Sequence, residues 1–169
     1  RVGNYIYTTY WGIFGLTAAG EDVKPQIAWL LTQQNADGSF GSYGTETGDS
    51  GDADNTAASI MALRAAGIPA DDPAVEAAVQ FLREAIEENG GYNYGYYSAP
   101  NLASTAWAVQ AFCSVGIDPS TVKSSAGNSP VDYLLSLQKE DGSFRYTETL
   151  TDTPVSMTAR AVAALSGCA

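Results

Sequence analysis

The chain has 169 residues, a formal net charge of −11 and 45% hydrophobic side chains, which is enough apolar material for one sizeable core. The negative charge argues against nucleic acid and anionic membrane surfaces as partners, and we interpret it as a source of solubility. Because the chain has no histidine, the commonest metal ligand and general base are missing, and Ser-His-Asp and Cys-His catalysis is excluded. We expect no metal, no cofactor and no membrane span.

Seven helices of two alternating kinds are predicted along the chain. Residues 73–88 carry apolar side chains at i, i+3 and i+4 spacing with polar side chains between them, which is typical of an amphipathic helix with one wet face. Residues 103–115 and 155–165 are apolar nearly all round, which indicates helices buried on every side. The pattern therefore predicts two layers, with the all-apolar helices inside. The predicted helices cover residues 5–19, 22–35, 55–67, 73–88, 101–115, 127–139 and 154–167.

Three blocks of the sequence repeat one another at an offset of 52 residues. Each block reads aromatic-Leu-x3-Gln-x3-Gly-x-aromatic, except that Ile86 replaces the glutamine of the middle block. A second repeated series, which starts with a threonine, runs between the blocks. Internal repetition with a period near 50 residues predicts an array of supersecondary units. The blocks are residues 29–40, 81–92 and 133–144, and the threonines are Thr9, Thr56, Thr105 and Thr158.

Glycines separate the elements of this array. A glycine follows each of the first three inner helices, where we expect it to adopt the left-handed conformation that ends a helix. Asp-Gly dipeptides at residues 37–38 and 141–142 are typical of tight turns and are expected to close outer helices. The capping glycines are Gly20, Gly67 and Gly116.

The two cysteines, Cys113 and Cys168, lie at nearly equivalent places in neighbouring copies of the inner-helix segment. Their spacing fits neither a CxxC motif nor a zinc site. We expect two buried free thiols. A disulfide between the two copies is the alternative if the chain is exported.

The three blocks resemble the QW repeat of squalene cyclases and prenyltransferase β-subunits, and the whole pattern is similar to the repeats of transcobalamin-like bacterial surface proteins. The resemblance covers nearly the whole chain. It implies an all-α fold, the α/α toroid, with concentric layers of inner and outer helices and residues 1–169 as a single repeat domain.

The length of the chain bears on how such a ring is completed. A full toroid of that family has about six helical hairpins, whereas this chain holds about three and a half. The resemblance therefore implies a part of a longer protein or an incomplete ring with an open apolar flank. Because the last predicted helix, residues 154–167, has no polar outer face, we expect self-association, further repeats or another partner to cover it.

One acidic motif opens the predicted inner helix at residues 55–67. Asp52-Ala53-Asp54-Asn55-Thr56 resembles the DxDD-Thr motif of protonating terpenoid cyclases, with Asn55 in place of the last aspartate. The resemblance assigns the proton donor to Asp54, next to Asp52, and this chemistry needs a neutral carboxylic acid in a dry pocket lined by aromatic faces. The alternative is that these side chains cap the helix, and we expect a cap. The candidate ligand-binding residues are Asn55, Tyr7, Tyr10, Trp11, Trp107 and Tyr94.

Two further segments have more than one interpretation. The acidic run Glu46, Asp49, Asp52 and Asp54 has oxygen ligands that suit calcium, but it lacks the spacing of a calcium-binding loop, so we expect a solvated acidic loop. The tyrosine-rich segment 90–97 is expected to pack between the ends of outer helices, and a ligand-facing lip is the alternative.

Three functional hypotheses follow. The first is a non-catalytic module of a secreted or cell-surface protein that binds a small apolar or terpenoid-like ligand, or a protein, near the N-terminal ends of the inner helices. The second is a terpenoid-cyclase-type enzyme with Asp54 as proton donor, and the third is a structural spacer. Ile86, Asn55 and the softened aromatics of the blocks favour the first hypothesis. A cytoplasmic location stays open.

Overall fold

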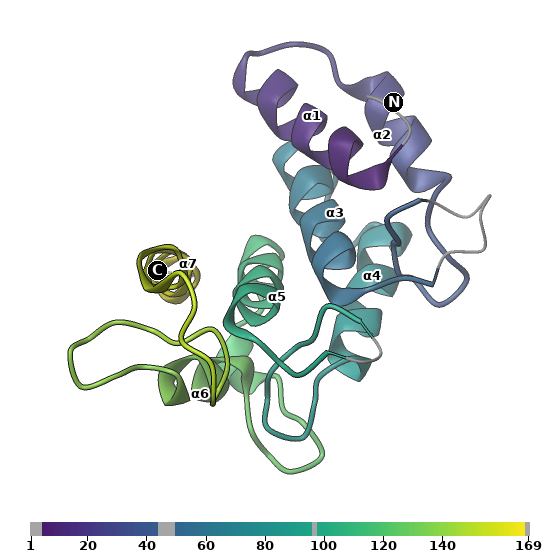
Figure 1. Ribbon diagram of the computed structural model, residues 1–169. Helices are drawn as coiled ribbons and strands as arrows, with labels where there is room; N and C mark the ends of the chain where they lie inside the picture. Colours follow the sequence, from purple (N-terminus) through teal and green to yellow (C-terminus); the bar gives the residue numbers. More distant parts are fainter. Residues whose placement is uncertain (1–4, 44–49, 96–97, 168–169) are drawn as a thin grey trace. The chain divides into compact units, whose positions relative to one another are not determined.

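The computed structural model describes residues 5–43, 50–95 and 98–167, and these residues form helices and no strand (Figure 1). No helix in this described part is long and apolar enough to cross a membrane. The helices are Ile6–Ala18 (α1), Lys24–Leu31 (α2), Ala53–Ala65 (α3), Pro73–Glu84 (α4), Leu102–Ser114 (α5), the 3₁₀ helix Pro119–Thr121 (η2), Pro130–Ser136 (α6) and Pro154–Ser166 (α7).

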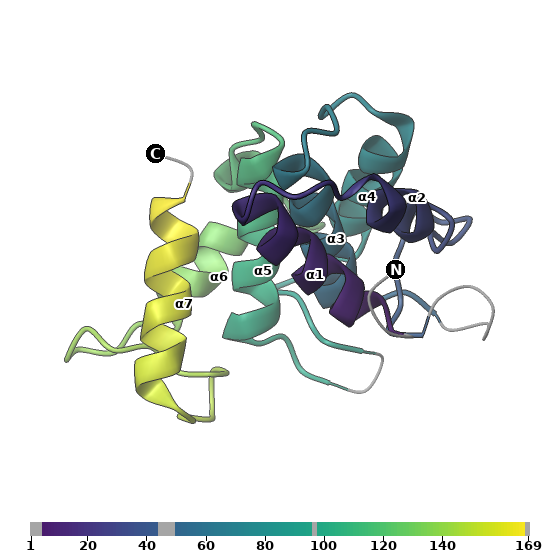
Figure 2. The ribbon, with the colours of Figure 1, turned by 90° about the horizontal axis from the view of Figure 1, so that it is seen from above.

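The chain divides into two compact units, residues 1–82 and 83–169, and each is described by itself. In the first unit, α1 packs against α2 and α3. In the second unit, α5 packs against α6 and α7, as both views show (Figures 1 and 2). α4 lies in the first unit up to Leu82. A single repeat domain over residues 1–169 stays a prediction.

Both predicted kinds of helix are present in the structure. α3 buries nine of its 13 residues and α5 buries eight of 13, so both are covered on nearly all sides. α4 buries only the stripe Val75, Ala78, Val79 and Leu82 and keeps its polar face in water. Since full burial of one aliphatic side chain is worth about 1.5–3 kcal/mol, the inner helices contribute most of the core. The fold is all-α and of the α/α-toroid class, with α1, α3, α5 and α7 as the inner helices.

One recurring hydrogen bond joins each block to the inner helix that follows it. The main-chain N–H of the aromatic residue that closes the block donates to the hydroxyl of the repeated threonine. Because these aromatic residues are buried, their N–H groups would otherwise lack a partner, at a cost of about 1–3 kcal/mol each. Each block is therefore joined by one hydrogen bond to the repeated threonine of the inner helix that follows it. The pairs are Phe40 to Thr56 at 3.0 Å, Tyr92 to Thr105 at 3.0 Å and Phe144 to Thr158 at 3.1 Å.

The glycine caps are also confirmed. Gly20, Gly67 and Gly116 have φ values of 77°, 87° and 77°. After Gly67, the N–H of Ile68 donates to the carbonyl of Leu63 at 3.0 Å, which is the hydrogen bond of a left-handed helix cap.

The predicted ends of the outer helices were wrong by three to four residues where the repeated turn begins. α2 ends at Leu31 instead of residue 35, and α4 ends at Glu84 instead of residue 88. The residues after each helix form a tight turn instead, in which the N–H of Glu87 donates to the carbonyl of Gly91 at 3.0 Å. α6 starts at Pro130 instead of residue 127, because a capping box fixes its first turn.

The prediction of free thiols was wrong for Cys113, which is disulfide-bonded. Cys113 lies in α5 and packs against the hydrophobic core of the second unit. The only other cysteine of the chain, Cys168, lies outside the described residues.

α7 differs from α5, the other helix that was predicted to be apolar nearly all round. It buries Met157, Ala161 and Ala164, but Val155 and Val162 are 84% and 56% exposed. The prediction of burial on every side was therefore wrong for this helix, which is covered on one face. The apolar flank that the repeat pattern predicted at this end is present.

The capping box of α6 gives a testable pH dependence. The Ser129 hydroxyl and main-chain N–H, with Lys123 nearby, lower the pKa of Asp132 from 3.8 to about 2. Because the pKa is lower in the folded state, the carboxylate stabilises the fold above pH 4, and this contribution is lost as the pH falls toward 2. Asp132 is exposed, so we expect a loss below about 1 kcal/mol after solvent screening. Urea unfolding of the chain and of Asp132→Asn between pH 2 and 6 measures it, and the variant should show the smaller dependence on pH.

Candidate functional site

The acidic motif lies at the N-terminal end of α3. Asp52 is the N-cap residue, and its two carboxylate oxygens accept hydrogen bonds from the main-chain N–H and the side-chain amide of Asn55, both at 2.7 Å. In α5 the N-cap is Asn101, whose side-chain oxygen accepts from the N–H of Ser104 at 3.0 Å. An amide therefore does in α5 what the carboxylate of Asp52 does in α3. Capping, as expected, accounts for Asp52.

Asp54 is a different case, since it is not the cap. It lies in the first turn of α3 and is half-buried, with its Oδ1 atom buried. The corresponding positions of α1, α5 and α7 hold Tyr7, Ala103 and Ser156. A carboxylate near a helix N-terminus is favoured by the helix dipole, but the repeat does not require one here. Neither helix capping nor the repeat pattern therefore explains why an acidic residue is present at position 54.

The loop after the first block brings α1 to this helix end. Ser42 accepts a hydrogen bond on its hydroxyl from the side-chain amide of Asn55 at 3.1 Å. Its carbonyl accepts from the N–H of Ile6, at the start of α1, also at 3.1 Å. The N-terminal ends of α1 and α3 therefore share one surface in the first unit, with Ser42 between them.

Three tyrosines gather on this surface, and we call them the tyrosine cluster. The rings of Tyr5 and Tyr7 are stacked with centroids 5.1 Å apart, and Tyr43 meets Tyr5 edge-on at 5.3 Å. All three stay exposed, by 38%, 41% and 56%. Sequence reasoning proposed Tyr7 but did not identify Tyr43 or Ser42. Ser42 and Tyr43 lie in the loop between α2 and α3. Only the fold of this loop brings them to the start of α1, and no pattern in the neighbouring sequence indicates this position.

The other candidate aromatic residues are distributed between the two units. Trp11 follows Tyr7 by one turn of α1 and is 55% exposed, whereas Tyr10 is buried and lies against Trp11 at 5.9 Å. Trp107 is half-buried in α5, and Tyr94 is exposed in the loop before α5, so both belong to the second unit. Within the first unit, the structure groups the acidic motif with Tyr7 and keeps Trp11 on the same helix.

The tyrosine-rich segment has both a packing residue and an exposed one. Tyr92 is fully buried, and burial raises the pKa of its phenol, whereas Tyr94 is exposed. Tyr96 and Tyr97 lie outside the described residues, as do Glu46 and Asp49 of the acidic run. Among the residues that are described, no group of three His, Cys, Asp or Glu side chains could hold a metal ion.

The roles of the two aspartates can be separated by substitution. We expect Asp52→Ala to destabilise the chain by about 1–2 kcal/mol because α3 loses its cap. Asp52→Asn should cost much less, since Asn101 caps α5 in the same way. Chemical unfolding of both variants measures the difference. If Asp52→Asn is as damaging as Asp52→Ala, then the charge of Asp52 matters and capping is not its main role.

Family models match nearly the whole chain. A model described as the squalene-hopene cyclase C-terminal domain matches residues 1–104, and one described as the prenyltransferase alpha-alpha toroid domain matches residues 68–168. The alternating helices and the repeated turn define an α/α-toroid protein. The chain belongs to the terpenoid cyclase and prenyltransferase family.

Two curated proteins are similar in sequence. One is a squalene–hopene cyclase of Zymomonas mobilis, 29% identical over 140 residues, and the other is a probable squalene–hopene cyclase of Sinorhizobium fredii, 32% identical over 148 residues. The matches cover 76% and 79% of this chain but only 20% and 22% of the relatives. The chain therefore spans about a fifth of their length.

A solved structure supports the fold. The protein geranylgeranyltransferase-I of Candida albicans, complexed with GGPP, matches 95% of this chain and 48% of its own with a TM-score of 0.72. The sequences are 16% identical, so this likeness shows the fold alone.

Proposed function

We propose that the chain binds an apolar, isoprenoid-type molecule without transforming it, on the surface formed by the N-terminal ends of α1 and α3. The observation that carries this proposal is the exposed tyrosine cluster next to the acidic motif, with exposed Trp11 one turn further along α1. Clustered exposed aromatic rings are uncommon on a soluble surface and mark places where an apolar partner binds.

The comparisons support the chemical class of the ligand. The relatives are named for squalene and hopene, and the structural neighbour holds GGPP. The site itself favours binding without reaction, because a proton donor for an alkene has to work in a water-free pocket. The three rings of the cluster are 38% to 56% exposed, and Asn55 interrupts the acidic motif.

We place this binding module in a secreted or cell-surface protein. Disulfides persist in oxidising compartments and are rare in the cytosol, and Cys113 is disulfide-bonded.

A titration with geranylgeraniol, followed by tryptophan fluorescence and calorimetry, tests the binding. We expect the double variant Tyr7→Ser and Trp11→Ser to bind at least about tenfold more weakly, since each lost aromatic contact costs about 1 kcal/mol or more. Leu150→Ser is the matched control, because Leu150 is 50% exposed and lies in the second unit. Unchanged calorimetric affinity in the double variant, or no binding by any form, would reject the proposed site.

A second function is favoured by Asp54, the acid that capping does not explain. In this case the chain is part of an enzyme that protonates a polyprenoid, with Asp54 as the donor. Incubation of the chain with squalene, followed by mass spectrometry, distinguishes the two functions. A cyclised product that Asp54→Asn abolishes supports the enzyme, whereas binding of geranylgeraniol with no product from either form supports the binding module.

A further inference from the structure

A small cavity in the second unit shares no residue with the surface proposed for the isoprenoid-type ligand. Its volume is about 220 Å³. Pockets for drug-sized molecules have volumes of about 300–1,000 Å³, so this cavity suits a single small group. The closing turn of the second block, the start of α5, α6 and the loop before α7 surround it. Its lining includes Asn89, Pro100, Tyr133, Thr147, Glu148 and Thr149.

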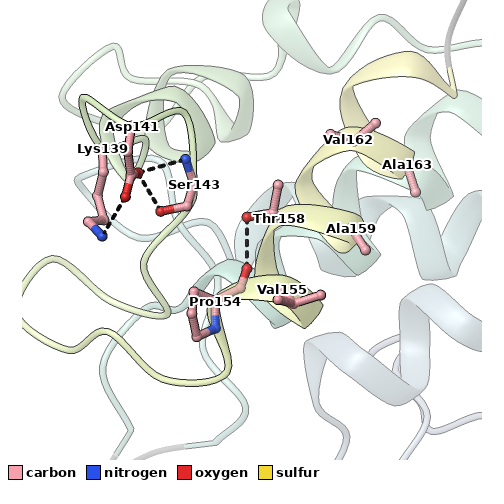
Figure 3. Close-up of a pocket in the computed structure, with 9 residues that line it drawn as sticks. All are labelled: Lys139, Asp141, Ser143, Pro154, Val155, Thr158, Ala159, Val162 and Ala163. Atoms are coloured by element: carbon pink, nitrogen blue, oxygen red, sulfur yellow. Dashed lines mark hydrogen bonds and ion pairs between the residues drawn. The ribbon is translucent and has the colours of Figure 1, made fainter.

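The second block departs from the repeat at two positions beside this cavity. In the first and third blocks the turn reads Asp-Gly-Ser, and the aspartate accepts hydrogen bonds from the main-chain N–H and the hydroxyl of the serine, as Figure 3 shows for Asp141 and Ser143. The second block has Asn89 and Gly91 instead. Asn89 accepts from the N–H of Gly91 at 3.1 Å, and its side-chain amide donates to Oε1 of Glu148, also at 3.1 Å. The change from aspartate to asparagine therefore places Glu148 at the cavity.

Gly91 makes room for Pro100 in the wall of the cavity. A methyl group on Gly91 would lie 2.7 Å from Cβ of Pro100 and 3.0 Å from the ring of Tyr133, whereas packed carbon atoms lie about 3.5–4 Å apart. In the first block the small residue is on the other side of this contact, because Gly51 holds the position of Pro100 and lies against Ser39. The hydroxyl of Tyr133 donates to the carbonyl of Pro100 at 2.6 Å. This wall is therefore fixed by packing and by a hydrogen bond.

Glu148 gives the cavity its charge. Among the described residues that line the cavity, it has the only charged side chain. Its Oε1 atom accepts from Asn89, whereas its Oε2 atom accepts no hydrogen bond from the part of the chain described. Arg145 donates to the main-chain carbonyl of Glu148 at 3.3 Å and not to the carboxylate. The cavity therefore favours a cation that can donate a hydrogen bond, and disfavours an anion.

The charge of Glu148 also acts on the buried part of the lining. Burial, and next the negative charge of Glu148, raise the pKa of the Tyr133 phenol. The side chains of Ala99 and Pro100 are apolar and offer no hydrogen-bond partner. A sugar, which has hydroxyl groups on most of its edges, would leave some of them unpaired against these two residues. A short alkyl chain that ends in a cation matches both parts of the lining.

We propose that this cavity, which we call the Glu148 cavity, binds a primary alkylammonium group, the chemistry of a free alkylamine or of a lysine side chain. The ammonium donates to Oε2 of Glu148, and the alkyl chain lies against Ala99 and Pro100. Asn89 holds the carboxylate in position through Oε1. The formal net charge of −11 attracts such cations to the protein.

Titration of the ¹⁵N-labelled 169-residue chain with butylamine at neutral pH, followed by NMR, tests this proposal. Butylammonium should shift the amide signals of residues 89–91 and 147–149. Butanol, which has the same alkyl chain without the charge, and glucose should bind at least about tenfold more weakly, because a hydrogen bond to a charged group is the stronger one. Nα-acetyl-lysine amide distinguishes the two sources: comparable binding supports a lysine side chain of a partner, and binding of butylamine alone supports a free amine.

Two variants locate the binding at the carboxylate. Glu148→Gln keeps an oxygen that accepts from Asn89 and removes the charge, so it should bind butylammonium at least about tenfold more weakly. Glu140→Gln is the matched control, because Glu140 is exposed in the same unit and does not line the cavity, and its affinity should be unchanged. The proposal is overturned if butylamine shifts no signal around the cavity, if butanol or glucose binds as tightly, or if Glu148→Gln binds as well as the original chain.

Discussion

Replacing Gly38 by alanine is expected to destabilise the chain by about 3–5 kcal/mol, whereas the same substitution at Gly142 should cost about 1–2 kcal/mol. The two glycines hold the same position in the repeated turn and have nearly the same backbone conformation, with φ values of 87° and 83°. Both substitutions therefore carry the same strain of a left-handed alanine. They differ in what the new methyl group meets, which is the carbonyl oxygen of Ala77 at Gly38 and, among the described residues, no atom within 4 Å at Gly142.

The pair of variants isolates the contact between consecutive outer helices. Urea unfolding of the chain, Gly38→Ala and Gly142→Ala gives the three stabilities, and the difference between the variants is the cost of pushing α4 away from the turn. Gly90→Ala should behave like Gly38→Ala, since its methyl group would meet the carbonyl of Ser129. Equal losses at Gly38 and Gly142 would mean that backbone strain alone explains the effect and that the turn does not hold the helices together.

The architecture could be predicted from the sequence because it depends on periodic patterns of apolar residues and glycines. The stripe of α4, the nearly all-apolar α5 and the glycine after each of the first three inner helices are local signals, and all three were confirmed. The ends of α2 and α4 could not be predicted from helix periodicity. They depend on hydrogen bonds within the turn, such as the one from the N–H of Asn35 to the carbonyl of Ser39, and the side chain of Gln34 joins this turn to α4, which is distant along the chain.

Some residues of the candidate site could likewise be predicted from the sequence, and others could not. The acidic motif and Tyr7 could be found from the sequence, because the motif resembles a family motif and Tyr7 holds the repeat position of Asp54 in the first inner helix. Ser42 and Tyr43 could not, since only the fold of the loop places them between α1 and α3. The motif alone also did not show which of its aspartates caps the helix, and the hydrogen bonds of Asp52 to Asn55 make that distinction.

Reduction of the disulfide at Cys113 is expected to lower the free energy of unfolding by about 4 kcal/mol. Cys113 is disulfide-bonded, and Cys168 is the only other cysteine available within the chain. A link between them closes a loop of about 55 residues and restricts the unfolded chain, which gives this magnitude in the chain-entropy model. Urea unfolding with and without a phosphine reductant measures the change.

The reduction experiment also tests the proposed cellular compartment of the protein. Cys113→Ser should match the reduced chain in stability and should not respond to the reductant, which separates the loss of the link from other effects of reduction. A chain stabilised by about 4 kcal/mol through one disulfide would lose much of a typical domain's stability in a reducing cytosol. A large effect of reduction therefore supports the proposed export of the protein. Alkylation and mass spectrometry that find two free thiols in the unreduced chain would remove that support and reject the disulfide together.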